Sequence, residues 1–183
     1  MTARIAPLEP PYDAETAEAL ARWMPPGSPI PPLALFRTLA RHPMLRDRMR
    51  PLGAGLLGRG VLPARTRELV ILRTSARCDA RYEWGVHVAA YAAAAGLDRE
   101  TVRATTLARP ELAGDDALAL AVADELHDTA TLSDHTFADA VERFGEAGVL
   151  ELAALAGFYH VIAYVIAAAR VEPEPWAAPF PES

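Results

Sequence analysis

The sequence contains no lysine and only one cysteine, Cys78, and each scarcity excludes a class of protein. All 18 basic residues are arginines, the net charge is −6, and no concentrated basic stripe is interleaved with aromatic residues. This pattern argues against nucleic-acid binding. A single cysteine cannot form an intrachain disulfide, so nothing points to an oxidising compartment.

Several familiar motifs are also missing. The chain has no phosphate-binding loop, no G-x-G-x-x-G, no H-E-x-x-H and no strand-like alternation longer than chance. The stretch Met1–Pro11 lacks the apolar segment of a signal peptide. The apolar run Leu152–Ala169 just reaches membrane-spanning length, but it is rich in alanine and has one basic flank, Arg170. We therefore expect a cytoplasmic protein without a membrane partner, with this run buried on all sides in a globular oligomer.

Hydrophobic residues make up 51% of the 183 residues, which is enough for one domain with a substantial core. Apolar residues recur at helical spacing along the chain, so we predict an all-α fold. Residues 1–32 are expected to form an arm with a short helix and a proline-rich linker, and residues 33–171 the helical domain. Residues 172–183 are a proline-rich tail with two aromatic residues, expected to lie across its own body or a partner subunit.

Individual residues predict where helices start, bend and end. Asp79, Asp98 and Ser133 are expected to cap helices. Pro51 is expected to kink or interrupt one helix, and Gly145 to end another.

The stretch Pro63–Gly96 carries the candidate chemistry. It predicts two consecutive helices, with Glu68 among apolar neighbours on the first. Glu83 and His87 lie four residues apart on the second and hence on one face. Two carboxylates and an imidazole in apolar surroundings suit proton transfer near neutral pH. The competing interpretations are a surface pair of Glu83 with His87 and a salt bridge from Glu68 to an arginine.

Two segments in this stretch, RELVILRTSARC and YEWGVHVAAYAAAAGL, resemble the carboxymuconolactone decarboxylase family, which has the alkylhydroperoxidase D-like fold. ADELHDTATLSD and GFYHVIAYVIAAARVEPE are similar to the C-terminal half of that family, so the resemblance covers about residues 33–173. It implies an all-α bundle that assembles into dimers, trimers or hexamers, with a small-molecule site near a subunit interface.

The peroxidase branch of this family uses a glutamate followed by C-x-x-C-x-x-x-H. In this chain Glu68 and His87 match the glutamate and the histidine, whereas Ala80 and Glu83 occupy the two cysteine positions. Because the only thiol, Cys78, lies two residues before the first of these positions, cycling through an internal disulfide is excluded. The chain is similar instead to the branch that relies on acid–base residues.

The resemblance implies a cofactor-independent enzyme acting on a small carbonyl or carboxylate compound, by decarboxylation, isomerisation or a lyase-type proton transfer. His87 would be the general acid or base, Glu83 would orient it or share its proton, and Glu68 would be a second base or orienter. Arg73 is the first candidate to bind an anionic substrate group. We predict no cofactor. A metal site of two carboxylates and one histidine lacks the Glu-x-x-His spacing of di-iron bundles, and we predict no metal either.

Other residues are assigned both a structural and a functional interpretation. Tyr82 and Trp84 flank Glu83 and would pack against a neighbouring helix or form a pocket wall. His127 and His160 are each expected to be core residues, although His160 could contact substrate. Cys78 leaves open a peroxidase-related redox protein. A non-catalytic binding or assembly protein is the third possibility, and it predicts a packed core without a cavity beside Glu68, Glu83 and His87.

Overall fold

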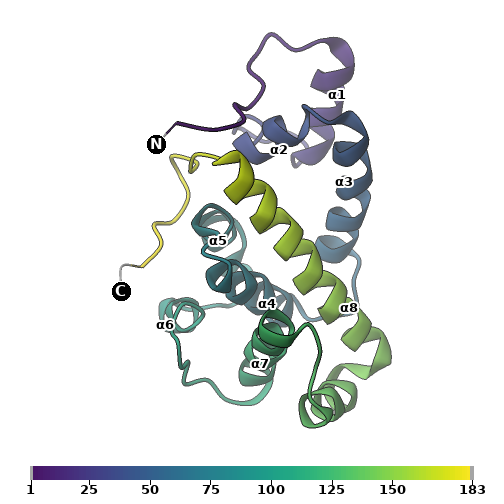
Figure 1. Cartoon of the computed structure of the whole chain (residues 1–183), viewed down its shortest axis with the longest axis vertical. Coiled ribbons are helices and arrows are strands. Elements are labelled where there is room, and N and C mark those ends of the chain that lie inside the picture. Colours follow the sequence, from purple (N-terminus) through teal and green to yellow (C-terminus); the bar gives the residue numbers. More distant parts are fainter. Residues whose placement is uncertain (1, 182–183) are drawn as a thin grey trace.

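The computed structural model describes residues 2–181, in which helices occur and strands do not (Figure 1). This confirms the predicted all-α class. The elements are α1 (Ala14–Trp23), α2 (Ala34–Leu39), α3 (Pro43–Gly58), α4 (Ala64–Arg77), α5 (Arg81–His87), the π-helix η1 (Val88–Ala92), α6 (Arg99–Ala104), α7 (Gly114–Thr129) and α8 (Asp134–Ala169).

Helix α4 is the centre of the core. It packs against α5, α7 and α8, and every residue from Glu68 to Ser75 is buried. A helix that is buried on all sides needs partners for its charged groups. Arg65 pairs with Asp116 of α7, and Arg73 pairs with Asp124 of the same helix. The two helices are therefore joined by ion pairs as well as by apolar packing.

A second apolar cluster lies where α2 and α3 meet α5 and the C-terminal half of α8. Leu35 and Met49 contribute from the first pair of helices, and Val86 and Ile162 from the second. Figure 1 shows α8 running across the molecule, with α1–α3 on one side and α4–α7 on the other. The residues between these two layers are the ones that can enclose a small molecule.

The structure confirms two of the predicted caps and corrects the third. Asp98 and Ser133 accept hydrogen bonds from the backbone N–H groups of Thr101 and Thr136. Asp79 does not cap α5: its φ is 50°, and its carboxylate accepts from the Arg81 side chain. The helix starts one residue later, after Ala80, without a side-chain cap.

Proline and glycine have different effects in the two long helices. Helix α3 runs through Pro51, so an interruption there is wrong, while a kink, the other expected effect, stays a prediction. Gly145 has φ 71° and ψ 171° and separates α8 into two helical segments, as predicted. Length and composition would let α8 cross a membrane, and half of its most apolar stretch is buried against the chain. The exposed side of α8 includes Leu150, Val161 and Tyr164. The burial of this side in an oligomer therefore stays a prediction.

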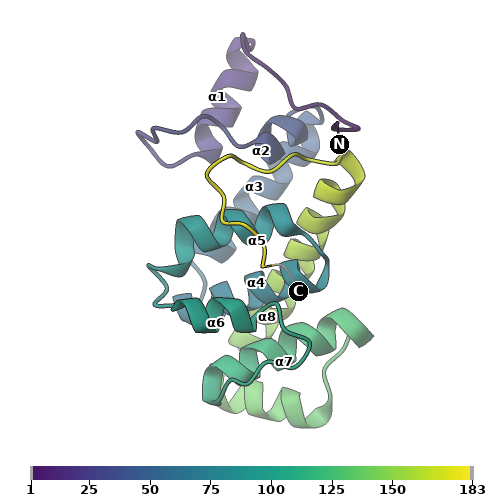
Figure 2. The ribbon, with the colours of Figure 1, turned by 90° about the vertical axis from the view of Figure 1, so that its left-hand side faces the viewer.

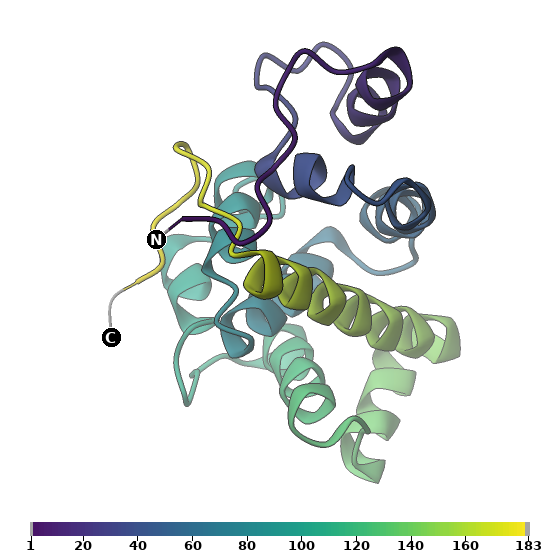
Figure 3. The same cartoon turned by 45° about the horizontal axis from the view of Figure 1, so that its top comes forward.

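Both terminal segments pack near the C-terminal end of α8 (Figure 3). The backbone N–H of Arg4 donates to the carbonyl of Ala169 at 2.8 Å. In Figure 2 the tail passes over α5, where Phe180 stacks edge-on against Trp84 with ring centroids 5.0 Å apart. The tail thus lies across its own body, one of the two placements expected from its aromatic residues.

Gly85 should be required for the tail to cross α5. Its carbonyl accepts from the N–H of Ala178, and a Cβ at Gly85 would collide with the Ala178 carbonyl oxygen. We expect Gly85→Ala to lower the free energy of unfolding by about 1–3 kcal/mol, the usual cost of overpacking, and to expose the tail to protease. Urea denaturation and limited proteolysis measure both effects.

Gly55→Ala is the matched control, because a Cβ there has open space within 4 Å. It should leave the tail protected and stabilise the protein by roughly 0.5–1 kcal/mol through helix propensity. A Gly85→Ala protein as stable and as protease-resistant as the wild type would contradict the proposed crossing.

Candidate active site

Three helices bring together a buried group of titratable side chains. Helix α4 contributes Glu68, which is 0% exposed, and α5 contributes Glu83 and His87, both buried. Helix α8 adds Tyr159, also buried. Because Glu83 and His87 are one helical turn apart, the local geometry of α5 is enough to place both on the face that meets α4 and α8.

His87 is held from both sides of its ring. Its Nδ1 lies 2.8 Å from Oε2 of Glu68, and its Nε2 lies 3.1 Å from the hydroxyl of Tyr159. Nε2 is also 3.5 Å from Oε1 of Glu83. Glu68 accepts a second bond, from Nε of Arg67 at 3.2 Å. Since Glu68 accepts the Nδ1 proton, Nε2 is the ring atom that can gain or lose a proton toward Glu83 and Tyr159.

The surroundings favour a charged imidazole. Burial opposes protonation of His87, but its hydrogen bonds to Glu68 and Glu83 and their negative charges outweigh burial and raise its pKa to about 9. Burial, together with the charges of Glu83 and Glu68, raises the pKa of Tyr159 well above its ordinary range. At neutral pH the group therefore contains a protonated imidazole and a phenol proton, with Glu83 near Nε2 of that imidazole.

A cavity of about 160 Å³ opens beside this group, and we call it the His87 cavity. Its walls are mostly apolar, with Glu83, His87 and Tyr159 at one end and two arginines elsewhere. The lining residues are Arg22, Trp23, Leu33, Leu35, Phe36, Arg50, Gly53, Ala54, Leu57, Glu83, Val86, His87, Tyr91, Phe158, Tyr159 and Ile162. Glu68 is absent from this lining and lies behind the His87 ring, so it supports the ring without facing the cavity.

A π-helical turn follows His87 directly. The segment η1 carries Tyr91, whose ring centroid lies 4.9 Å from that of His87. Single π-helical turns within α-helices are frequent at functional sites, because the widened turn changes where the following side chains point. Here the turn places an aromatic wall of the cavity next to the titratable group.

Three predicted substrate contacts lie away from the cavity. Arg73 is 2% exposed, pairs with both oxygens of Asp124 and donates to the carbonyls of Thr105 and Leu107. The structure does not place Arg73, the first candidate to bind an anionic substrate group, in the cavity wall, because Asp124 of α7 and the carbonyls of Thr105 and Leu107 accept its hydrogen bonds elsewhere. Tyr82 donates to Glu174 in the tail at 2.7 Å.

Trp84 donates from Nε1 to the hydroxyl of Thr105 at 3.0 Å and packs against Phe180. Trp84 and Tyr82 therefore hold α5 to the rest of the chain, which is the packing role that the sequence left open for both. Cys78 and His160 line a different concavity, together with His127.

Sequence reasoning missed Tyr159, Arg22 and Arg50. Tyr159 had a signal, because it is one of few polar side chains in the run Leu152–Ala169. The two arginines had none, since their segments lie far from Pro63–Gly96 in the sequence. Among residues 2–181 the terminal guanidinium nitrogens of Arg50 make no hydrogen bond or ion pair, while its Nε donates to the carbonyl of Arg22 at 2.7 Å.

The fold and the buried glutamate–histidine group define an all-helical protein with a candidate acid–base site between helices. Residues 43–125 match the model of the carboxymuconolactone decarboxylase family, so this part of the chain is similar to that family. No curated protein matches the chain.

Two solved structures have a similar fold. One is a cysteine-to-alanine variant of the debrominase Bmp8 in complex with 2,3,4-tribromopyrrole, with a TM-score of 0.76 and 17% identity over 96% of this chain and 94% of that one. The other is Bmp8 without ligand, with a TM-score of 0.70 and 15% identity over 93% and 92% of the two chains. At this level of identity the likeness shows the fold alone.

The raised pKa of His87 predicts how stability depends on pH. An unfolded imidazole titrates near pH 6.5 and the folded one near 9, so folding favours the protonated form. The difference in free energy of unfolding between wild type and His87→Gln should be largest below about pH 6.5 and fall by roughly 3 kcal/mol as the pH rises through 9. Urea denaturation at a series of pH values measures it.

His135→Gln, at an exposed position near the start of α8, is the control and should show no such dependence. A wild-type advantage that stays constant or grows between pH 6.5 and pH 9 would contradict the raised pKa.

Proposed function

We propose that this protein is a cofactor-independent acid–base enzyme that transfers a proton in a small carbonyl or carboxylate compound. The proposal rests on one observation, the Glu68–His87–Glu83 group with Tyr159 beside a mostly apolar cavity. Positioned proton donors and acceptors beside a mostly apolar cavity are what such chemistry requires.

The geometry suggests a role for each residue. Glu68 fixes the tautomer of His87 from behind, as a carboxylate bound to Nδ1 does in other acid–base sites. His87 presents its Nε2 proton to the cavity. Glu83 is the carboxylate on the cavity wall and is suited to accept a proton from carbon. Tyr159 keeps its phenol proton and can donate a hydrogen bond to a developing oxyanion.

In a decarboxylation, the bond between the substrate carbon and its carboxylate breaks, and the electron pair moves into the neighbouring carbonyl to give an enolate. Carbon dioxide leaves, and His87 then donates its Nε2 proton to the same carbon, so that a proton replaces carbon dioxide. In an isomerisation, Glu83 removes a proton from the carbon beside the carbonyl, and His87 returns one at another carbon. Both reactions balance without an oxidant or reductant.

The cavity favours a small substrate. Its volume of about 160 Å³ is below the roughly 300–1,000 Å³ of pockets for drug-sized ligands. Arg50 and Arg22 replace Arg73 as the candidates to bind an anionic group. The structural neighbour Bmp8 was solved with a small substituted ring, 2,3,4-tribromopyrrole, which is compatible with a compact, mostly apolar ligand here.

The two alternatives have less support. Cys78 lies outside the His87 cavity, and burial raises the pKa of its thiol, which lowers the thiolate population that peroxide chemistry needs. A non-catalytic scaffold predicts Glu68, Glu83 and His87 in a packed core, whereas two of them line a cavity.

Removing the proposed acid should abolish most turnover. The assay uses a panel of small β-keto acids and carboxylated lactones. Release of carbon dioxide reports decarboxylation, and incorporation of solvent deuterium at carbon, followed by NMR, reports proton transfer. We expect His87→Gln to lower kcat/KM by ~10²–10⁴-fold. Glu68→Gln should lower kcat and shift the pH profile toward acid, because it no longer stabilises the imidazolium.

His135→Gln is again the matched control and should keep full activity. Wild-type protein that exchanges no carbon-bound proton in any compound of the panel would contradict the proposed substrate class. Equal turnover by wild type and His87→Gln would contradict the proposed acid.

A further inference from the structure

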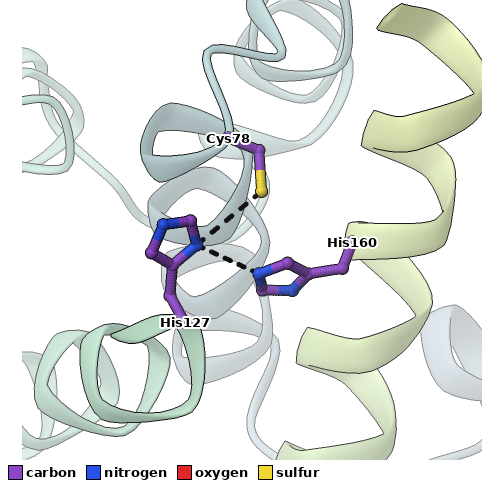
Figure 4. A group of neighbouring side chains, drawn as sticks. All are labelled: Cys78, His127 and His160. Carbon is purple, nitrogen blue, oxygen red and sulfur yellow. Dashed lines mark hydrogen bonds between the residues drawn. The ribbon is translucent and has the colours of Figure 1, made fainter. Parts of the chain in front are cut away.

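Three side chains that the acid–base site does not use converge on the other side of α8. Cys78 ends α4, His127 lies in the last turn of α7, and His160 lies within α8 (Figure 4). Nδ1 of His127 is 3.8 Å from Sγ of Cys78 and 3.0 Å from Nε2 of His160. The three atoms all lie within 4.8 Å of one another.

These separations are close to those of ligands around a tetrahedral metal ion. Zinc–nitrogen distances of about 2.0–2.1 Å and a zinc–sulfur distance of about 2.3 Å place two nitrogens roughly 3.3 Å apart and a sulfur and a nitrogen roughly 3.6 Å apart. The observed 3.0 Å and 3.8 Å differ from these by only a few tenths of an ångström. Small side-chain rotations would therefore bring all three ligands to one ion.

One of the histidines is already oriented as a ligand. Nδ1 of His160 donates to the carbonyl of Ala156 at 2.8 Å, so its Nε2 carries the lone pair, and Nε2 is the atom that faces the cluster. A backbone carbonyl that fixes the opposite ring nitrogen is the usual support of a metal-binding histidine.

The charges around the cluster also suit a cation. Arg77, one residue before Cys78, is paired with Asp124 at 2.9 Å and with Asp128 at 2.5 Å, so its positive charge is balanced. The thiol of Cys78 would lose its proton to solvent as the ion binds.

We propose that Cys78, His127 and His160 form a binding site for one zinc-class transition-metal ion. A thiolate with two imidazoles suits Zn²⁺ and its neighbours in softness better than it suits Mg²⁺ or Ca²⁺. Three protein ligands leave the fourth position open to a concavity of about 580 Å³, so a water molecule or a small anion can complete the coordination.

This metal site is separate from the acid–base site. His160 follows Tyr159 on α8, and successive helical residues point about 100° apart. Tyr159 therefore faces the His87 cavity while His160 faces the concavity beyond, and the two linings share no residue. The proposal consequently stands or falls independently of the proposed reaction.

Cobalt(II), a spectroscopic substitute for Zn²⁺, tests the site directly. The reduced, chelator-treated full chain is titrated with Co²⁺ and then with Zn²⁺. We expect one equivalent to bind, with tetrahedral visible bands and a thiolate-to-cobalt band in the near ultraviolet that Zn²⁺ removes. Cys78→Ser should lose the near-ultraviolet band, and His160→Gln should weaken binding by more than ~100-fold, beyond the loss typical of an outer-shell change.

Two controls locate the ion. His135→Gln and His87→Gln should bind Co²⁺ like the wild type, and circular dichroism checks that each variant is folded. A Zn²⁺-dependent rise in the Tm of the wild type that is absent in His160→Gln gives a second readout. Wild type without a thiolate-to-cobalt band, or binding that is lost in His87→Gln and kept in Cys78→Ser, would overturn the proposal.

Discussion

The buried hydrogen bond between the carboxylate of Glu68 and the ring of His87 is the constraint on which the site depends. A carboxylate inside an apolar helix is costly unless it is paired, and Glu68 is 0% exposed on a helix buried on every side. The 2.8 Å contact to Nδ1 of His87 meets that need and at the same time fixes the ring. One interaction therefore joins α4 to α5, raises the pKa of the imidazole and directs Nε2 toward Glu83 and the cavity. Replacing His87 would leave Arg67 as the hydrogen-bond donor to Glu68, and replacing Glu68 would leave the His87 ring held only through Nε2.

Local spacing was sufficient to predict part of this site. The four-residue separation of Glu83 and His87 is a property of one helix, and the short break before α5 folds it back against Glu68. Long-range pairing was not predictable in the same way. Arg73 follows Glu68 by five residues on α4, about 140° around the helix axis. Asp124 of α7 binds it there, and nothing near Arg73 in the sequence identifies that partner. Likewise Asp79 has the chemistry of a cap, yet its positive φ leaves that position to Ala80.

Much of the cavity wall comes from outside the segment that matches the family, residues 43–125. Helices α1 and α2 with the linker between them contribute one side of the wall, from Arg22 to Phe36, and α8 contributes Phe158, Tyr159 and Ile162. The matched segment thus holds Glu68, Glu83 and His87, while the flanking segments contribute Tyr159 and much of the cavity wall. Helix α8 borders both hollows, because Tyr159 lines the His87 cavity and His160 lines the concavity on the other side of the helix. The exposed apolar side chains of α8, which include Leu150, Val161 and Tyr164, could pack against a partner subunit of the kind that the family resemblance predicts.

The protonation state of His87 in the folded protein tests the central claim most directly. In protein labelled with ¹⁵N at histidine, the two ring nitrogens of His87 report whether one or both carry a proton. The account predicts that at pH 7.5 both nitrogens of His87 are protonated, and that Glu68→Gln leaves only one of them protonated at the same pH. A neutral ring at pH 7.5 in the wild type, with spectra unchanged by Glu68→Gln, would contradict it.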